Sequence, residues 1–562
     1  MSVAVPLSDD ADRPARAAQV CNLARLLSHT ARLLPQHTAL IHADQRWTWA
    51  EIDARVNALV SALRALGLKR GDRILVQSRN NVAMFESAWA AFRMGCVWVP
   101  TNFRLAPADV AYLGASSGAV VMLVEPVFAA HAEAAQQASA ALRQLVWISP
   151  LADPLPRPAA DQHDYETLVQ RHLGATAAEA IVTQDDPLWF FYTSGTTGRP
   201  KAAILTHGQM SFVVTNHLAD LIPGTDERDC AIAVAPLSHG AGIHALLNVA
   251  RGAATVLMPG EKLDVALFWQ LVQQHRVSNL FTVPTIVKLL VEHPAVDQFD
   301  HSSLRFVIYA GAPMYRADQR LALQKLGPVL VQYFGLGEVT GCITVLPAHM
   351  HSADDASPDA NIGSCGKPRT GMEVAILAAD LSPLPAGEVG EICVRGPAVF
   401  AGYFNNPAAT AKALRGGWFH TGDLGKFDAR GLLTITGRES DMYISGGSNV
   451  YPLEAEEVLL AHPGVAEVAV LGVPDRQWGE VGVAVVVLRR ASADDAVARV
   501  EAEPLDEAAL LAWLDGRLAR YRLPRRVFFW DALPKSGYGK ITKKDLRALL
   551  FERGEVLPVQ AD

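Results

Sequence analysis

The sequence has few of the features that mark membrane, exported or nucleic-acid-binding proteins. No apolar run approaches the roughly 18 residues that a membrane-spanning helix needs. Lys and Arg form no dense block and the formal net charge is −8, which argues against nucleic acid as the main partner. Residues 1–20 contain several acidic residues and lack the apolar core of an export signal, so we expect a disordered leader there.

Cysteine is also scarce. The 6 cysteines contain no Cys-x-x-Cys pair, which argues against a metal or redox motif. We expect them to be small core residues in a reduced compartment, and the cytoplasm is the predicted location. The sequence leaves the oligomeric state open, a homodimer included.

Apolar residues are abundant, and their pattern predicts an α/β protein. They make up 50% of the 562 residues, enough for several buried cores. Apolar strands alternate with helices over residues 38–150 and again from about residue 200 to residue 333. Such alternation predicts parallel sheets that helices cover on both faces, with ligands bound at the carboxyl ends of the strands. Two such blocks predict a large domain of two packed α/β subdomains.

The remainder of the chain has a different texture. Short strands with glycine turns over residues 363–436 predict a small β-barrel-like subdomain. Beyond it, helices at 453–461 and 507–519 and strands at 465–471, 481–488 and 526–530 predict a small α+β domain. We therefore predict an amino-terminal domain over residues 21–437, a hinge at 438–441 and a carboxy-terminal domain over residues 442–562.

Between two predicted strands lies a stretch of hydroxyl residues and glycines that ends at Lys201. Its residues are Thr193, Ser194, Gly195, Thr196, Thr197 and Gly198. Backbone N–H groups in such a loop can surround an anion, and Lys201 adds a positive charge for phosphate oxygens. The spacing differs from that of the P-loop of NTPases. The plainer alternative is a solvated hairpin turn.

This stretch resembles the phosphate loop of the adenylate-forming superfamily, which includes acyl- and aryl-CoA synthetases, peptide-synthetase adenylation domains and firefly luciferases. The segment from Tyr333 to Glu338 resembles the superfamily's Tyr-Gly-x-Thr-Glu motif, with Phe334 in place of the tyrosine and Gly337 in place of the threonine. The resemblance implies that the aromatic residues and Gly335 contact adenine. It also implies that Glu338 and Thr193 hold Mg²⁺ between phosphates. A glycine-rich turn with an exposed glutamate is the alternative.

Further motifs of the same superfamily follow in order. Gly311, Ala312 and Pro313 resemble its adenine wall. Asp423, in a Thr-Gly-Asp motif, and Arg438 resemble its ribose and phosphate contacts, although a surface turn and a surface ion pair would also explain them.

The carboxy-terminal motifs concern movement and the thiol. Ser440 lies at the superfamily's hinge, and Ser445, Gly446 and Gly447 resemble the segment that approaches the pantetheine arm. A Gly/Ser connector is the alternative for that segment. Lys540 resembles the superfamily's mobile catalytic lysine, which implies that it contacts the α-phosphate; a lysine in a charged tail is the alternative.

The resemblance implies an AMP-forming acyl-CoA synthetase that uses ATP, Mg²⁺ and coenzyme A. A carboxylate would attack the α-phosphate of ATP, and a thiol would then attack the acyl-adenylate. This chemistry depends on positioning and charge neutralisation, with Lys201 and Lys540 supplying positive charge. The short stretch after Lys540 leaves no room for a carrier domain, so free CoA is the expected thiol.

The loop at residues 236–242 bears on the identity of the acid. It lacks an aspartate that could pair with an α-ammonium group, and burying that group unpaired would be costly, which argues against an amino acid as the substrate. His239 resembles a gate beside the acyl site, or is an ordinary core histidine. Gly240, Gly242 and Gly341 predict a roomy apolar pocket without a cation, and hence a medium- or long-chain fatty acid.

Several alternatives stay open. Within the same class they are an aryl- or arylalkanoate-CoA ligase and an acyl-AMP ligase that acts on a carrier protein. From other classes, the Gly337 and Ser440 departures leave room for an inactive nucleotide-binding regulator, and a luciferase-type oxygenase is less favoured because nothing in the sequence demands oxygen.

Overall fold

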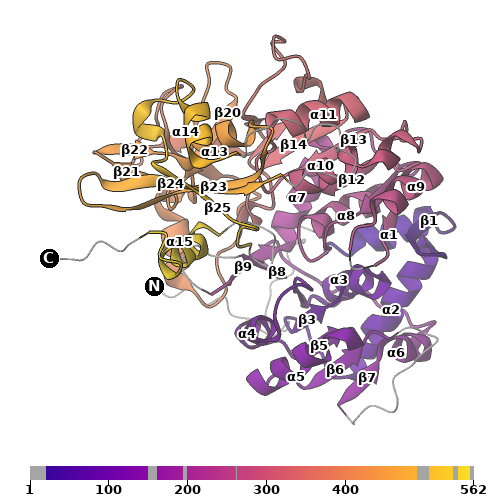
Figure 1. The fold of residues 1–562 in the computed structure, drawn as a ribbon. Helices are drawn as coiled ribbons and strands as arrows, with labels where there is room; N and C mark the ends of the chain where they lie inside the picture. Colours follow the sequence, from indigo (N-terminus) through magenta and orange to yellow (C-terminus); the bar gives the residue numbers. More distant parts are fainter. Residues whose placement is uncertain are drawn as a thin grey trace. The chain divides into compact units, whose positions relative to one another are not determined.

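The computed structural model describes residues 21–149, 161–193, 199–260, 262–489, 505–535 and 542–556. Internal contacts divide them into two compact units, and Figure 1 shows their helices and strands coloured along the sequence. Unit 1 comprises residues up to 314 together with 318–374 and 393–420, and unit 2 comprises 315–317, 375–392 and the chain from 421 onward. Within the described ranges, every helix is too short or too polar to cross a bilayer. The α/β class that the sequence predicts is confirmed.

The first sheet of unit 1 has strand order β7-β6-β5-β3-β4-β8-β9, and only its β8–β9 pair is antiparallel. Its strands are β3 (Arg73–Gln77), β4 (Val97–Pro100), β5 (Val121–Val124), β6 (Gln144–Trp147), β7 (Gln162–Asp164), β8 (Pro187–Thr193) and β9 (Lys201–Thr206). The neighbouring helices are α2 (Trp49–Ala65), α3 (Val82–Met94), α4 (Pro107–Ser117), α5 (Ala129–Ala138) and α6 (Tyr165–His172). Residues of α4 and α5 join one face of this sheet in a single apolar cluster.

Local sequence signals explain where these helices begin and end. The Thr48 hydroxyl accepts from the backbone N–H of Glu51, whose carboxylate accepts from the Thr48 N–H, a capping box at the start of α2. The Asn81 side chain caps α3 at its amino end, and Gly95 ends it with a φ of 67°, which glycine adopts without steric cost.

The second sheet of unit 1 runs in the order β16-β15-β14-β13-β12-β10-β11-β1-β2. Its strands are β1 (Thr38–His42), β2 (Gln45–Thr48), β10 (Cys230–Ala233), β11 (Ala254–Leu257), β12 (Asn279–Thr282), β13 (Phe306–Tyr309), β14 (Leu330–Phe334), β15 (Thr344–Leu346) and β16 (Ser364–Pro368). Helices α1 (Arg25–Leu33), α7 (His207–Asp220), α8 (Gly240–Arg251), α9 (Val265–His275), α10 (Pro284–Glu292) and α11 (Arg316–Leu326) accompany it. Six adjacent strands of this sheet are parallel to one another: β14, β13, β12, β10, β11 and β1. Their carboxyl ends therefore share one edge.

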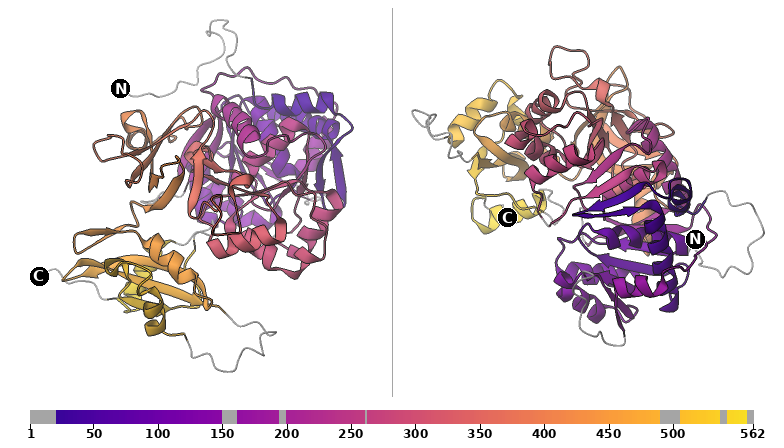
Figure 2. Two further views of the ribbon diagram at one scale, coloured as in Figure 1. Left: turned by 90° about the horizontal axis from the view of Figure 1, so that it is seen from above. Right: turned by 90° about the vertical axis from the view of Figure 1, so that its right-hand side faces the viewer.

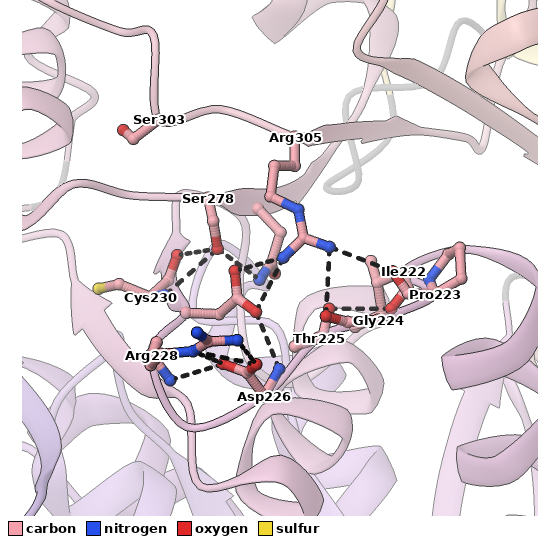
Figure 3. Close-up of polar contacts among 12 residues, drawn as sticks. Ile222, Pro223, Gly224, Thr225, Asp226, Arg228, Cys230, Ser278, Ser303 and Arg305 are labelled. Carbon is pink, nitrogen blue, oxygen red and sulfur yellow. Dashed lines mark hydrogen bonds and ion pairs between the residues drawn. The ribbon is translucent and has the colours of Figure 1, made fainter.

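At the amino ends of these parallel strands lies a cluster of polar contacts (Figure 3). Arg305, just before β13, pairs with Asp229, just before β10, at 2.9 Å. The same guanidinium donates to the carbonyl oxygens of Pro223 and Gly224, each at 3.2 Å. The Arg305 guanidinium thus finds its partners within the cluster, and the cluster lies away from the carboxyl ends of the strands. We therefore assign it a structural role.

Unit 2 contains two groups of strands. The first, β17 (Glu373–Leu377), β18 (Gly390–Arg395), β19 (Phe419–Phe427) and β20 (Leu433–Arg438), lies in chain order without returning on itself, so no closed barrel forms among the described residues. The second group has the order β22-β21-β24-β23, with β25 beside β24. Its elements are β21 (Tyr443–Ser445), β22 (Ser448–Val450), α13 (Pro452–Leu460), β23 (Val465–Asp475), β24 (Gly479–Leu488), α14 (Glu507–Leu514), β25 (Arg526–Phe529) and α15 (Lys543–Glu552).

The second group forms a layered core. Helices α13 and α14 pack on one face of β23 and β24, and α15 packs on the other (Figures 1 and 2). The α+β character predicted for this part of the chain is confirmed. Five of the cysteines are buried, as predicted, and Cys21 is exposed instead.

Candidate active site

The predicted phosphate loop connects two antiparallel strands. Thr193 ends β8, Lys201 begins β9, and the two residues face each other across the ladder. The predicted strand–loop–strand arrangement is therefore present at the base of the loop. Ser194, Gly195, Thr196, Thr197 and Gly198 lie outside the described residues.

Glu338 lies beside this loop base. It sits in a short 3-10 turn, η4 (Gly337–Val339), after β14, and only 5% of it is exposed. Its Oε1 accepts hydrogen bonds from the Thr193 hydroxyl at 3.0 Å and from the Tyr403 hydroxyl at 2.9 Å. Burial and the adjacent Glu338 carboxylate raise the pKa of Tyr403, so its hydroxyl keeps its proton and remains a donor. The sequence prediction that Thr193 and Glu338 meet is supported by this contact.

Tyr403 is a site residue that the sequence analysis missed. Its segment runs beside β9, with the Ile204 N–H donating to the Gly402 carbonyl at 2.9 Å. The Phe400 N–H donates to the Glu338 carbonyl at 2.8 Å. The Lys201 ammonium lies 4.6 Å from the centre of the Tyr403 ring, a cation–π contact. Tyr403 therefore connects the predicted metal-binding carboxylate with the predicted phosphate-binding lysine.

The packing around position 337 explains why glycine occurs there. A Cβ atom there would lie 2.7 Å from the Phe191 ring and 2.9 Å from Cγ2 of Thr193. The Phe191 ring in turn lies edge-on to His239, with 5.6 Å between ring centres. The superfamily motif has a threonine at this position; here the Phe191 ring lies where the Cβ of such a side chain would make contact.

The predicted adenine contacts fall on loops at the carboxyl ends of β13 and β14. Gly311, Ala312 and Pro313 follow β13 and are exposed. Phe334 is half-buried, whereas Tyr333 is buried against other rings. A Cβ on Gly335 would lie 2.3 Å from the Cα of Gly341, so these two glycines make a close backbone contact. Of these two rings, Phe334 is therefore the one that keeps an exposed part.

The surroundings of the predicted acyl-pocket glycines differ from expectation. A Cβ on Gly240 would lie 2.5 Å from the Phe281 ring, and one on Gly341 would lie 2.4 Å from the Tyr333 ring. A Cβ on Gly242 would meet the Leu237 carbonyl oxygen at 2.0 Å. The roomy apolar pocket stays a prediction: these glycines permit close packing of rings and backbone, and Gly242 also borders a pocket lined by apolar side chains of α3 and α8.

A buried polar network adjoins these rings. His244 stacks on Phe281 with 4.6 Å between ring centres, and it also contacts the rings of Tyr333 and His217. Arg369, which is 1% exposed, donates to Nδ1 of His217 at 3.3 Å. A buried guanidinium therefore lies one residue beyond the rings that pack on Gly240 and Gly341.

Unit 2 brings together the predicted ribose contacts. Asp423 and Arg438 are paired across β19 and β20, and Arg438 Nε donates to Asp423 Oδ1 at 3.1 Å. Asp423 is buried, whereas the Arg438 side chain is 44% exposed, so the guanidinium is open to a ligand. Ser440, at the predicted hinge, is exposed. Lys540 lies outside the described residues.

The predicted pantetheine segment is a tight turn. Gly446 and Gly447, with φ of 57° and 81°, join β21 to β22 in the conformation of a two-residue hairpin. The Gly446 N–H donates to the carbonyl of Trp478, whose indole is 38% exposed. The Arg525 guanidinium lies 5.1 Å from the centre of that ring. An exposed aromatic face and a cation thus lie next to Ser445, Gly446 and Gly447.

The donor set near Glu338 fits a hard divalent cation. A carboxylate offers about four lone-pair positions, and here Thr193 and Tyr403 use part of that capacity. Mg²⁺ prefers a carboxylate, hydroxyls and phosphate oxygens, and Glu338 and Thr193 provide the protein's share of these.

Comparison with known proteins identifies the family. The family model described as AMP-binding enzyme matches residues 27–404, and that described as AMP-binding enzyme C-terminal domain matches residues 454–540. The chain belongs to the AMP-binding enzyme family. Its sequence is 38% identical over 521 residues to a feruloyl-CoA synthase of Amycolatopsis sp., covering 92% of this chain and 96% of the relative. It is 33% identical to a long-chain-fatty-acid–CoA ligase of Mycobacterium tuberculosis, covering 94% of this chain and 98% of the relative.

A solved structure of the family gives the same fold. The o-succinylbenzoate-CoA synthetase of Bacillus subtilis, in complex with its acyl-adenylate intermediate, matches with a TM-score of 0.79 and 28% identity. The match covers 93% of this AMP-binding enzyme and 98% of the bacillary chain. The enzyme is an AMP-forming acid–thiol ligase that uses ATP and coenzyme A, whereas the acids named for its relatives range from aromatic to long-chain aliphatic.

Proposed function

We propose that this enzyme converts an aromatic or arylalkanoic acid into its CoA thioester, through an acyl-adenylate and with release of diphosphate and AMP. The observation that carries the proposal is the contact network of Thr193, Glu338 and Tyr403 beside Lys201, at the mouth of the strand–loop–strand turn. It supplies oxygen ligands for a cation and a positive charge for phosphate within one cluster. Such an arrangement suits phosphoryl transfer, which needs electrostatic positioning rather than a protein nucleophile.

In the first half-reaction, the substrate carboxylate attacks the α-phosphorus of ATP and diphosphate leaves. Residues 193–198 and Lys201 hold the β- and γ-phosphates. Gly311, Ala312, Pro313, Phe334 and Gly335 hold the adenine. Bound at Glu338 and Thr193, Mg²⁺ would neutralise phosphate charge. Lys540 stabilises the charge that develops on the α-phosphate, and Asp423 and Arg438 hold the ribose.

In the second half-reaction, the CoA thiolate attacks the acyl carbonyl and AMP leaves. The carboxy-terminal domain turns about the hinge at residues 438–441, where the small side chain of Ser440 tolerates a change of backbone angles. The turn Ser445–Gly447 then approaches the pantetheine arm. The exposed Trp478 ring and Arg525, next to this turn, support a site for the CoA nucleotide.

An aromatic acid is a better fit than the fatty acid that the sequence predicts. Rings of Phe281, His244 and Tyr333 stack beside Gly240 and Gly341, with interplanar angles of 8° to 23°. Stacked rings offer flat faces and offset-stacking partners to a planar substrate, whereas a long alkyl chain needs an extended apolar channel. The 38% identity to a feruloyl-CoA synthase supports the same choice.

The test is CoA-dependent AMP formation with a panel of acids: cinnamic, phenylacetic, octanoic and palmitic acid. We expect the aromatic acids to have kcat/KM values at least about tenfold above those of the aliphatic acids, because ring stacking adds to the burial of apolar area. Hydroxamate formation with hydroxylamine, but no CoA-dependent formation of AMP, would indicate an acyl-AMP ligase. Neither AMP nor hydroxamate from any acid would indicate an inactive nucleotide-binding protein and would overturn the proposal.

A further inference from the structure

A buried polar cluster adjoins the stacked rings and shares His244 with them, and the proposed first half-reaction assigns no role to its other members. Its members are His217 and Asp220 of α7, His244 of α8, Cys342 before β15, and Arg369 after β16. Arg369 Nε donates to Asp220 Oδ2 at 3.1 Å, and its Nη2 donates to His217 Nδ1. The rings of His217 and His244 lie 5.4 Å apart between centres.

Three nitrogen atoms of this cluster are buried and have no hydrogen-bond partner among the described residues. They are Nη1 of Arg369, Nε2 of His217 and Nε2 of His244. These side chains are 1%, 0% and 6% exposed. Buried polar groups in native proteins are normally satisfied, so three such atoms in one cluster point to a missing partner.

The chemistry of that partner follows from the protonation of the cluster. Burial and the Arg369 charge hold the pKa of His217 well below its usual value, and burial together with Arg369 lowers that of His244 to about 3. Both imidazoles are therefore neutral at pH 7. A guanidinium can only donate, so the tautomer in which Nδ1 of His217 accepts from Arg369 carries its proton on Nε2. Arg369 Nη1 and His217 Nε2 are consequently two unpaired donors, and they require an acceptor.

Only one ring separates this cluster from the glycines assigned to the acyl site. Tyr333 lies 6.0 Å from the His217 ring and 5.9 Å from the His244 ring, between ring centres. Its ring edge meets Gly341, at which a Cβ would lie 2.4 Å away. An acid bound beside Gly341 therefore lies one ring away from Arg369 and His217.

We propose that Arg369 and His217 select acids that carry a hydrogen-bond-accepting oxygen at the end remote from the reacting carboxylate. This inference rests on the proposed function, because it assigns the far end of the same acyl site. Asp220 already balances the charge of Arg369 and also accepts from the Thr370 hydroxyl at 2.8 Å. A neutral ether, phenol or keto oxygen is therefore favoured over a second carboxylate, which would be buried without a counter-charge of its own.

The experiment compares acids with one skeleton: cinnamic acid, 4-methylcinnamic acid, 4-methoxycinnamic acid and 4-carboxycinnamic acid. The readout is kcat and KM for AMP formation by the full-length enzyme. We expect 4-methoxycinnamic acid to exceed 4-methylcinnamic acid, which has a similar shape, by about tenfold or more in kcat/KM. A site whose buried donors stay unpaired rejects the analogue that lacks the oxygen. Preference for the 4-carboxy acid over the 4-methoxy acid would assign the acceptor as a carboxylate instead.

The variant Arg369→Met removes the donor and retains much of the volume. We expect it to bring the methoxy and methyl acids within about threefold of each other, chiefly by raising KM for the methoxy acid. The matched control is Arg93→Met. Arg93 is also 1% exposed and has one unpaired nitrogen, but it is anchored by Asp53 and Asn57 between α2 and α3, so its loss should leave the ratio unchanged.

The outcomes separate this inference from the proposed function. If the wild-type enzyme turns over all four acids but treats the methoxy and methyl acids alike, the inference is wrong while the ligase activity stands. The wild-type panel decides this even if Arg369→Met fails to fold, and His217→Phe offers a second route to the loss of one donor. Equal reduction of all acids by Arg369→Met would indicate a purely structural arginine. Absence of turnover with every acid would overturn the proposed function itself.

Discussion

The Tyr403 hydroxyl offers the sharpest test of the active-site network, because Tyr403→Phe removes one hydrogen bond and keeps the ring. The hydroxyl donates to the Glu338 carboxylate at 2.9 Å, and the ring beneath Lys201 would be unchanged. A hydrogen bond to a charged group contributes about 1.5–3 kcal/mol. If that energy holds Glu338 in position in the transition state, adenylation should slow about 10- to 150-fold, since each 1.36 kcal/mol is a factor of ten.

Tyr165→Phe is a matched control. The Tyr165 hydroxyl also donates to a buried carboxylate, Oε2 of Glu86, at 2.6 Å, but this pair lies among α3 and α6, with no predicted site residue in it. Both variants should lose a similar amount of thermal stability. Only Tyr403→Phe should lose acid-dependent exchange of radioactive diphosphate into ATP. An exchange rate within about threefold of wild type in Tyr403→Phe, or an equal loss in Tyr165→Phe, would refute the assignment.

Three further predictions concern single residues. Lys540→Ala should reduce adenylation about 10²–10³-fold, the usual effect of removing one preorganised donor, while thioester formation from supplied acyl-AMP persists. Lys544→Ala is the control. Normal adenylation by Lys540→Ala would exclude the role assigned to Lys540. Gly337→Ala should lower the adenylation rate at least about tenfold, because the added Cβ would lie 2.7 Å from the Phe191 ring. In a double-mutant cycle, adding Phe191→Ala to the same chain should restore part of that rate. Additive losses of rate would argue against a steric cause. Trp478→Ala should raise KM for CoA about tenfold and leave diphosphate exchange unchanged, since base stacking on an aromatic ring contributes about 1–3 kcal/mol. An unchanged KM for CoA would remove Trp478 from the proposed CoA site.

Much of the fold follows from local signals in the sequence. Helix α13 and strand β25 begin and end within one residue of the predicted ranges 453–461 and 526–530, because helical periodicity and an apolar run mark them. Helix α14 ends at Leu514, well before residue 519, because Asp515 leaves the helical conformation and Gly516 has a φ of 74°. Helices α7 and α8 were not predicted; α8 begins with two glycines and is buried along most of its length, which hides its amphipathic pattern.

The site was predictable where its residues belong to contiguous motifs. Asp423 and Arg438 meet because they are opposed in one antiparallel pair, and Thr193 and Lys201 meet for the same reason. Tyr403 and Arg369 could not be predicted, because their contacts with Glu338 and His217 join distant parts of the chain and no spacing in the sequence reports them. The packing beside Gly240 and Gly341 could not be predicted for a related reason: a glycine pattern does not reveal which rings lie next to it.

The contact between Gly335 and Gly341 has a consequence for engineering. The two backbones touch so closely that the segment between them is a closed loop, with the Gly341 N–H donating to the Leu336 carbonyl at 3.2 Å. The carboxylate of Glu338 is thus carried on a short closed loop, which neighbouring segments contact through Thr193 and Tyr403. Transplanting residues 335–341 as one piece between homologous scaffolds should preserve its internal shape, whereas piecemeal exchange at either glycine would force the junction apart.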